Sequence, residues 1–281
     1  MLAKVKLNNN QICNLFMCRM AAIIQKERIS EQILNTIWEK MILMGQDKTT
    51  IHEHNEGREG QFIHGHGWGC AWINETGKIE RYISGNPIWE DNLPEIIKYK
   101  ILQSKSVIIH VRKASPNLPV APNYCHPFIK FLESNEQIAL AHNGTIMNPE
   151  ILAYDNNLNL EASESDTEKL LLHYITKITQ VENKSNRIEG LKKIIMDSNL
   201  EYSGLNLMIL FNNEMLLTNN YLQTPKYLGM KYLQTDDLLI VASEKIGEIE
   251  GEWKDMENHS IIHIKNNDLD TINFHNTNSV N

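Results

Sequence analysis

Cysteine is scarce in this chain, with four among 281 residues and no CxxC pair. The four are Cys13, Cys18, Cys70 and Cys125. Such spacing does not provide the disulfide framework of a small secreted domain. The first residues also make a poor secretory signal, because Arg19 interrupts the first apolar stretch. The cysteine pattern therefore indicates a protein of the reducing cytoplasm.

Long apolar runs and an excess of positive charge are also lacking. No apolar run approaches the roughly 20 residues that a membrane-spanning helix needs. Acidic residues outnumber basic residues by 35 to 27, and the net charge is −8, so a nucleic-acid partner is not expected. Hydrophobic residues make up 42% of the chain, which is ordinary for a globular protein. The sequence thus predicts a globular protein that binds neither membranes nor nucleic acid.

Strands and helices are expected in blocks rather than in strict alternation. The first block is a buried strand over 18–24, followed by a helix that Ser30 caps. The later strands are expected near 69–73, 79–83, 106–111, 138–142, 205–211, 215–218, 238–242 and 261–264. The later helices are expected over 94–102, 167–178 and 188–196. This order favours stacked sheets with helices outside them over a doubly wound parallel sheet.

A set of residues suited to amide hydrolysis is spread through the chain. The thiol of Cys18 can attack a carbonyl carbon, but the attack needs a base and donors for the oxyanion. Asn143 offers a side-chain NH₂, and Gly144 offers a backbone N–H that a ligand can approach closely. Arg112, at the end of a buried strand, can hold a carboxylate with two hydrogen bonds. Asp166, just before a helix, can hold an ammonium group or can simply cap that helix.

The base for Cys18 is not evident among the side chains, because no Cys-His-Asn pattern stands out. A free α-amine on Cys18 is an alternative base, with a pKa of about 7.7–8.0. Met17 precedes Cys18. Removal of an initiator methionine at position 17, or of a leader that begins at Met1, would expose this amine.

Five motifs in order make the sequence resemble the class II glutamine amidotransferases, the family whose nucleophile is the N-terminal residue. These motifs are Met17-Cys18-Arg19, His110-Val111-Arg112, Cys125-His126-Pro127-Phe128, Ala141-His142-Asn143-Gly144 and Ser163-Glu164-Ser165-Asp166-Thr167-Glu168. The resemblance is greatest to small stand-alone members. It extends from Cys18 to about Glu244, which is most of the chain.

The resemblance implies a fold and a role for each motif. The fold would be of the α+β class, a four-layer αββα sandwich. Cys18 would be the nucleophile with its own amine as base, and Asn143 and Gly144 would form the oxyanion hole. Arg112 would bind the α-carboxylate of glutamine, and Asp166 would bind its α-ammonium. The further substrate-binding residues would be Trp68, Gly69 and Ser115. The family needs neither a metal nor a cofactor for this reaction.

The implied reaction is hydrolysis of the γ-amide of glutamine, or of a larger γ-glutamyl compound, through a cysteine thioester. Ammonia would leave or pass to a separate synthase subunit, because the roughly 37 residues after Glu244 are too few for a second catalytic domain. Two positions depart from the family pattern. His66 stands where many relatives have Asp, and Lys113 where relatives often have Trp or Gln. These two positions can change the acceptor or the substrate.

The expected domain spans residues 18–265. Residues 1–17 are interpreted as a leader or a mis-assigned start, and residues 266–281 as a frayed tail, because both ends are Asn-rich. A leader that is never removed would leave Cys18 without a free amine. The domain would then be a non-catalytic module that binds glutamine or a protein partner.

A second rival reading is a metal-dependent hydrolase. Its possible ligands are His52, His54, His64, His66 and Cys70. The segment that carries these histidines is polar and loop-like, and it contains no convincingly placed Asp or Glu ligand. The sequence therefore favours the cysteine hydrolase.

Overall fold

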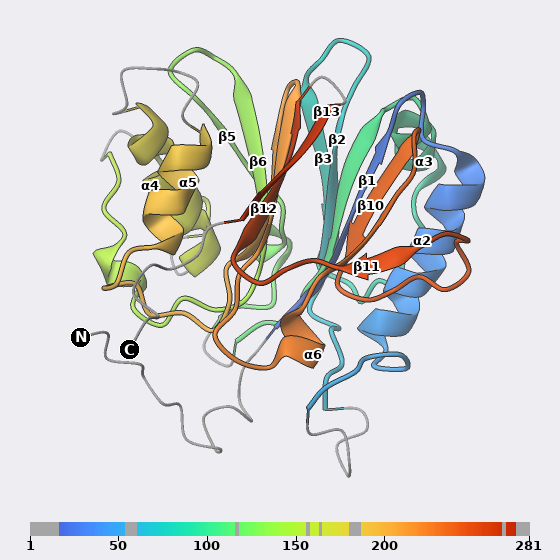
Figure 1. Ribbon diagram of the computed structural model, residues 1–281, viewed down its shortest axis with the longest axis horizontal. Coiled ribbons are helices and arrows are strands. Elements are labelled where there is room, and N and C mark those ends of the chain that lie inside the picture. Colours follow the sequence, from blue (N-terminus) through green and yellow to red (C-terminus); the bar gives the residue numbers. More distant parts are fainter. Residues whose placement is uncertain are drawn as a thin grey trace.

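Two antiparallel β-sheets form the middle of the molecule, and helices cover their outer faces (Figure 1). The computed structural model describes residues 17–53, 61–115, 118–155, 158–162, 165–179, 187–265 and 268–273. The seven-stranded sheet has the order β11 (Trp253–Asp255), β9 (Lys231–Gln234), β10 (Leu238–Ala242), β1 (Arg19–Gln25), β4 (Ser106–Val111), β2 (Trp68–Ile73) and β3 (Ile79–Ser84). The six-stranded sheet has the order β13 (Asp268–Asn273), β12 (Ser260–Lys265), β8 (Glu214–Asn219), β7 (Asn206–Phe211), β6 (Gln137–Asn143) and β5 (Phe128–Phe131).

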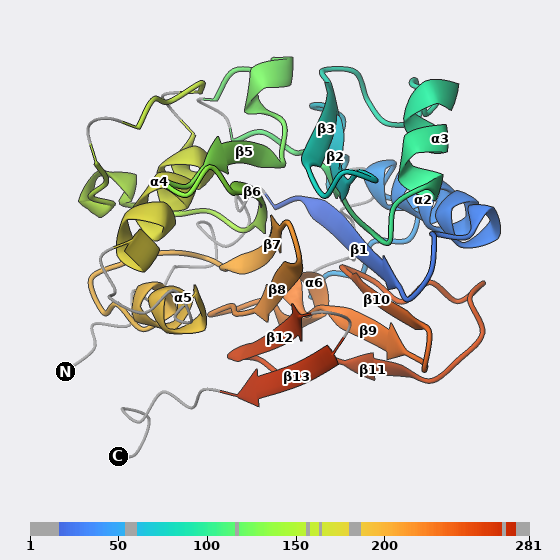
Figure 2. The ribbon, with the colours of Figure 1, turned by 90° about the horizontal axis from the view of Figure 1, so that it is seen from above.

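The helices lie on the two outer faces and below the sheets. The α-helices are α2 (Glu31–Gly45), α3 (Glu95–Leu102), α4 (Asp166–Thr179), α5 (Arg187–Ile195) and α6 (Pro225–Leu228). Two short 3₁₀ helices, Pro122–Tyr124 and Pro149–Ile151, lie in connections. Figure 2 shows α4 and α5 on one outer side and α2 and α3 on the other, with both sheets between them. None of the described helices is long and apolar enough to cross a membrane.

The central strands of the seven-stranded sheet are apolar on both faces because both faces are covered. In β1, Ala21 and Ile23 pack in one cluster with residues of α2. The alternate residues Met20 and Ala22 pack against the six-stranded sheet. As expected, Ser30 caps α2, and its hydroxyl accepts a backbone N–H of the first turn.

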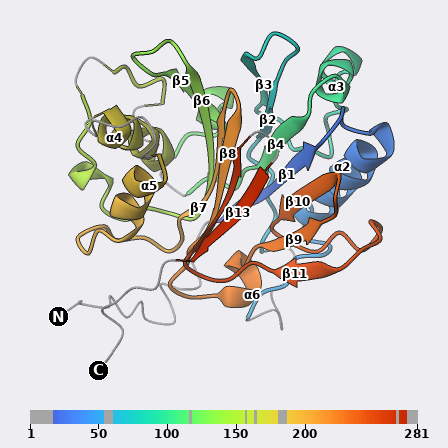
Figure 3. The same ribbon diagram turned by 45° about the horizontal axis from the view of Figure 1, so that its top comes forward.

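The six-stranded sheet repeats this arrangement with α4 and α5. In β7, Leu207 and Ile209 pack with these helices, whereas Met208 and Leu210 face the seven-stranded sheet. The layers follow one another in the order helices, sheet, sheet and helices (Figure 3). Three apolar clusters fill the three interfaces between these layers. The expected four-layer αββα sandwich is confirmed.

Several short elements were not expected from the sequence. They are β5, β9, β11 and α6, each of four residues or fewer. Such lengths are too short for an apolar period to show. The expectation of a frayed tail is wrong for residues 268–273, because β13 pairs with β12 along its whole length. Residues 1–16 and 274–281, which hold most of the expected leader and the rest of the tail, lie outside the described residues.

Residues from both sheets meet at one edge of the sandwich. Arg19 pairs with Val111, so Cys18, just before β1, lies beside Arg112, just after β4. In the other sheet β6 ends at Asn143, whose side chain reaches Cys18. The register of β1 and β4, together with the end of β6, therefore assembles residues that are far apart in the sequence.

Candidate active site

The thiol of Cys18 lies against the peptide that follows Arg112. The side chain of Cys18 is 6% exposed. Its sulfur accepts a hydrogen bond from the N–H of Lys113 at 3.5 Å and lies 3.8 Å from the carbonyl oxygen of Lys113. Burial raises the pKa of the Cys18 thiol, and the Lys113 N–H offsets only part of this effect. Cys18 therefore keeps its proton at neutral pH and needs a base.

Asn143 connects the backbone of Cys18 to the six-stranded sheet. The N–H of Cys18 donates to Oδ1 of Asn143 at 2.8 Å. Because Oδ1 faces the nitrogen of Cys18, the Nδ2 group of the same amide points away from that nitrogen. Nδ2 is buried and has no hydrogen-bond partner among the described residues. A buried donor without a partner is costly, so this atom is suited to bind an oxygen that arrives with a ligand.

Gly144 follows Asn143 at a place where no side chain fits. Its φ is +150°, and an added Cβ would lie 1.9 Å from the carbonyl oxygen of Gly204. Only glycine allows this close approach without strain. Gly144, which follows Asn143 directly in the chain, lines the pocket.

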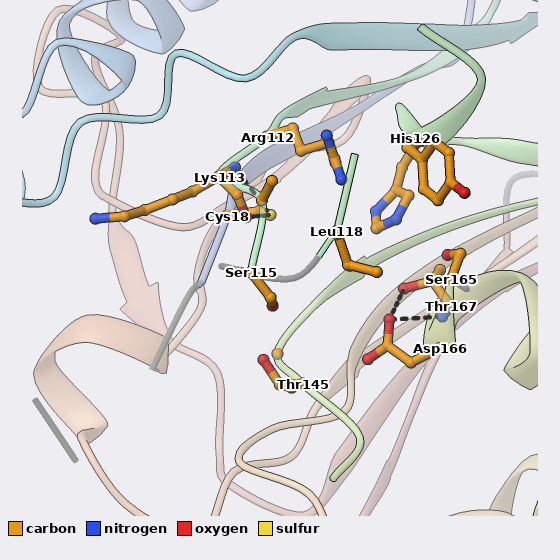
Figure 4. A pocket seen from close by; sticks show the side chains of 13 residues that line it. Cys18, Arg112, Lys113, Ser115, Leu118, His126, Thr145, Ser165, Asp166 and Thr167 are labelled. Carbon is orange, nitrogen blue, oxygen red and sulfur yellow. Dashed lines mark hydrogen bonds between the residues drawn. The ribbon is translucent and has the colours of Figure 1, made fainter. Parts of the chain in front are cut away.

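Arg112 and Asp166 line the same pocket as Cys18 (Figure 4). Arg112 is 3% exposed. Its guanidinium donates to the carbonyl oxygen of His66 at 3.3 Å and forms no ion pair with a carboxylate of the described residues. In Figure 4 Arg112 and Asp166 lie on different sides of the pocket. An α-amino acid head group between them would have opposite charges matched at both ends.

The carboxylate of Asp166 is positioned by backbone groups. Oδ2 accepts the N–H of Ile146 at 2.8 Å, and Oδ1 accepts the N–H of Thr167 at 2.8 Å. The helix-capping interaction comes from Ser165, whose hydroxyl accepts the N–H of Glu168 at 3.3 Å. The alternative in which Asp166 simply caps the helix is therefore wrong, since Asp166 is the first residue of α4.

The pocket contains residues that sequence reasoning did not single out. Ser115 lines it, as does Lys113, one of the two positions that depart from the family pattern. The lining residues His126, Ser165 and Thr167 belong to the motifs, whereas Ala114, Leu118, Tyr124 and Thr145 were not expected. Most of these lie within a few residues of a predicted one, so proximity to the motifs was the available signal. Leu118 lies three residues after Ser115, and Tyr124 directly precedes the Cys125-His126-Pro127-Phe128 motif.

Three buried histidines, His110, His126 and His142, lie beside the pocket, and His126 lines it. Nδ1 of His126 lies 3.1 Å from Nε2 of His110, which in turn contacts the carbonyl oxygen of His142. Burial lowers the pKa of His110 to about 3 and that of His126 well below the usual histidine value. Both rings are therefore neutral and serve as packed, hydrogen-bonded supports.

Trp68 and Gly69, which the family resemblance assigns to substrate binding, are not among the residues that line the pocket beside Cys18. Trp68 is fully buried among the apolar residues between the seven-stranded sheet and its helices, and its indole N–H donates to Asp91 at 3.0 Å. Neighbouring residues of a strand face opposite sides, and Gly69 lies behind the pocket wall. A Cβ on Gly69 would lie 2.4 Å from the carbonyl oxygen of His126, so Gly69 supports the pocket without lining it.

The histidines of the rival metal site have separate partners. The ring of His52 stacks on Phe62 at 4.4 Å, and Nε2 of His64 lies 2.9 Å from the hydroxyl of Tyr227. Nδ1 of His66 accepts the N–H of Ala114 at 2.9 Å. The part of the chain that the structure describes holds no group of three or more His, Cys, Asp or Glu side chains suited to a metal.

His54, the fourth histidine of the rival site, lies outside the described residues. The three described histidines of this segment thus take part in packing and hydrogen bonding.

A family model described as glutamine amidotransferases class-II matches residues 52–223, which is more than half of the chain. The chain belongs to the class II glutamine amidotransferases. This family acts on small-molecule amides, and the matched part contains Arg112, Asn143, Gly144 and Asp166. Cys18 lies before the matched part.

Two curated relatives share part of this amidotransferase chain. An uncharacterized protein of Methanocaldococcus jannaschii is 26% identical over 230 residues, which cover 73% of this chain and 62% of that protein. A gamma-glutamyl-hercynylcysteine sulfoxide hydrolase of Mycolicibacterium smegmatis is 31% identical over 80 residues, which cover 28% of this chain and 33% of that protein. The matches thus span less than two thirds of each relative's length.

Solved structures support the fold of this amidotransferase. Glutamine phosphoribosylpyrophosphate amidotransferase from B. subtilis gives a TM-score of 0.60 at 20% identity, covering 92% of this chain and 49% of that one. A glutamine aminotransferase class-II domain protein from Silicibacter pomeroyi gives a TM-score of 0.57 at 14% identity, covering 92% and 99%. At these identities the likeness shows a shared fold.

Proposed function

We propose that this chain hydrolyses the γ-amide of glutamine, or of a γ-glutamyl compound, with Cys18 as nucleophile. One observation carries the proposal. Asn143 binds the backbone nitrogen of Cys18 through Oδ1, and its Nδ2 stays buried and unpartnered among the described residues. The same side chain thus fixes the nitrogen of the nucleophile and offers a donor for an oxyanion. Family membership supports amide chemistry at this site.

The first half-reaction begins once Cys18 is the first residue. Its α-amine, with a pKa of about 7.7–8.0, takes the proton of the thiol directly or through a water. The sulfur then attacks the γ-carbonyl carbon, and the oxyanion is held by Nδ2 of Asn143 and the N–H of Gly144. When the C–N bond breaks, the α-ammonium returns the proton to the leaving nitrogen. The products are a γ-glutamyl thioester on Cys18 and a free amine or ammonia.

Water completes the reaction. The α-amine removes a proton from a water, which attacks the thioester carbon, and glutamate leaves as the sulfur regains its proton. Arg112 and Asp166 hold the α-carboxylate and α-ammonium of the glutamyl group throughout. The positions of these two groups fix the distance between the head group and the carbonyl that is attacked.

The nucleophile is tested by replacing Cys18 in the chain that begins there. Cys18→Ala should abolish glutaminase activity and the thioester adduct seen by intact mass, with the far-UV circular dichroism unchanged. Cys70→Ala is the matched control, because burial raises the pKa of Cys70 to about 12 and its thiol lies in the apolar core. Activity retained by Cys18→Ala would end the nucleophile assignment.

The fate of the amine is a separate part of the proposal. With glutamine as substrate, the ammonia released would be used only where a synthase accepts it. With a larger γ-glutamyl compound no acceptor is needed, and the relative named gamma-glutamyl-hercynylcysteine sulfoxide hydrolase supports this form of the reaction. Assays of glutamine and γ-glutamyl amides by the same protein distinguish the two.

The second candidate function is a non-catalytic binding module. The surroundings of Met17 favour this candidate for a chain that keeps Met17. Met17 is fully buried and peptide-bonded to Cys18, so the nitrogen of Cys18 is then an amide. Intact mass and N-terminal sequencing of protein expressed from the native gene decide between the candidates. A chain that begins at Cys18 supports the hydrolase, and a chain that keeps Met17 supports the module.

A further inference from the structure

Met17 occupies an apolar niche directly beside the nitrogen of Cys18. The Met17 side chain is fully buried in a small cluster with Phe62, Tyr227 and Leu228, which is separate from the three main clusters. The backbone carbonyl of Met17 also has a partner, because the hydroxyl of Tyr227 donates to it at 3.3 Å. We call the space that Met17 fills, lined by Phe62, Tyr227 and Leu228, the Met17 niche.

The walls of the Met17 niche are held by contacts that do not involve Met17. The guanidinium of Arg19 lies over the ring of Tyr227 at 3.7 Å and donates to the Tyr227 carbonyl at 3.2 Å. The ring of Phe62 stacks on His52 at 4.4 Å. Loss of Met17 therefore leaves these walls supported, and an apolar space would remain.

The Met17 niche lies beside the nitrogen of Cys18, which is the atom that exchanges a proton with the leaving group. The α-amine of Cys18 returns a proton to the leaving nitrogen, so the two nitrogens must come within about 3 Å of each other. In the present chain the carbonyl carbon of Met17 is bonded to this same nitrogen of Cys18. A substituent on the leaving nitrogen therefore starts next to the space from which Met17 has been removed.

The chemistry of the niche selects the substituent. Its walls are apolar, and Met17 shows that a flexible chain of methionine size fits between them. The Tyr227 hydroxyl, which also lies 2.9 Å from Nε2 of His64, offers one polar contact at the entrance. Ammonia would leave this apolar space empty, whereas an alkylamine would fill it and bury apolar surface.

We infer that, in the chain that begins at Cys18, the Met17 niche is the leaving-group subsite, which takes the apolar substituent of a γ-glutamyl amide. This inference rests on the proposed function and narrows its substrate class to γ-glutamyl amides of amines with a methionine-sized apolar group. The bond changes are those of the first half-reaction. The C–N bond of the amide breaks, the C–S bond to Cys18 forms, and the amine leaves with the proton from the α-ammonium.

The test compares two substrates on one protein. A chain that starts at Met17 is expressed so that methionine aminopeptidase exposes Cys18, and its N-terminus and cooperative thermal unfolding are checked. The kcat/KM for γ-glutamyl n-butylamide is then divided by that for glutamine. This ratio should be about ten or more, because apolar groups of this size in a matching pocket give discrimination of that order.

Variants of Phe62 connect the ratio to the niche. Phe62→Trp should fill the niche and lower the ratio about tenfold, whereas Phe62→Ala should enlarge it and shift the preference to γ-glutamyl phenethylamide. Phe131→Ala, at an exposed phenylalanine of β5, is the control and should leave the ratio unchanged. The two Phe62 variants shift specificity in opposite directions, so either one that folds gives a result.

The outcomes separate this inference from the proposed function. Glutamine hydrolysis with a ratio of one or less, unaffected by either Phe62 variant, would overturn the subsite and leave the hydrolase standing. A folded protein that begins at Cys18 and cleaves neither substrate would overturn both. A protein that cannot fold without Met17 would also overturn both, because the niche would then be a structural site for Met17.

Discussion

The site residues that the two sheets contribute differ in the hydrogen bonds that hold them in place. On the seven-stranded sheet, the sulfur of Cys18 has long contacts to one peptide group, and Arg112 donates to one carbonyl oxygen. On the other side, Asp166 accepts two backbone N–H groups. Both ring nitrogens of His142, the neighbour of Asn143, also have partners. The reacting thiol is thus held loosely, while the groups around it are held in fixed positions.

Replacement of Asn143 should give the largest change after loss of the nucleophile. Asn143→Ala removes the Nδ2 donor and should lower kcat by about 10²–10³, the usual effect of losing one oxyanion donor. Asn143→Asp keeps Oδ1 and still lacks the NH₂ group, so it should lower kcat as well. Steady-state kinetics with glutamine or a γ-glutamyl amide checks this. An unchanged kcat in both variants would place the oxyanion elsewhere.

Replacement of Arg112 tests the other sheet and should act on a different kinetic constant. Arg112→Ala should raise KM, because it removes a buried charged partner of the substrate carboxylate. The rise should correspond to a loss of roughly 2–4 kcal/mol in binding free energy. Arg112→Lys keeps the charge without the bidentate geometry, so its KM should lie between that of the unchanged protein and that of Arg112→Ala. If Arg112→Ala left KM unchanged and lowered kcat, Arg112 would not be the residue that binds the substrate carboxylate, and its role would no longer differ from that of Asn143.

The pH dependence distinguishes the α-amine from a histidine base. The α-amine accepts a proton only when neutral, so kcat/KM should fall about tenfold per pH unit below a pKa of roughly 7.7–8.0. Burial raises the pKa of the Cys18 thiol and lowers that of His126. Neither group is therefore expected to titrate near pH 6.5. A profile measured from about pH 6 to 9 checks this. An acidic limb near pH 6.5 that disappears in His126→Gln would identify a histidine base instead.

The predictable parts of the molecule are those with repeated or ordered signals. The sequence predicts the strand over 106–111 with the bounds that the structure has, because most of its residues are apolar, as is typical of a strand buried on both faces. Strands of three or four residues, such as β11 and β5, gave no period to read. The composition of the tail does not predict β13, because this strand forms by pairing with the edge of β12, and the position of that edge is a property of the fold.

The candidate site was partly predictable for a similar reason. Cys18, Arg112 and Asp166 were placed together through motif order, and the pocket does contain all three. Tyr124 joins them through tertiary packing. The resemblance assigns Trp68 to the pocket because Gly67-Trp68-Gly69 matches a Gly-Trp-Gly segment that lies near the substrate pocket in the family. Such a match does not say which face of the strand a side chain occupies.

The smallest expected effect tests this last distinction between a wall residue and a core residue. Trp68→Phe keeps an aromatic ring in the core and removes the N–H that donates to Asp91 at 3.0 Å. It should lower the free energy of unfolding by about 0.5–1.5 kcal/mol, the net worth of one hydrogen bond. KM should stay within about twofold, since Trp68 faces the helices rather than the pocket. Urea unfolding and steady-state kinetics on the same preparation give both numbers. A rise in KM comparable to that of Arg112→Ala, with stability unchanged, would return Trp68 to the substrate pocket.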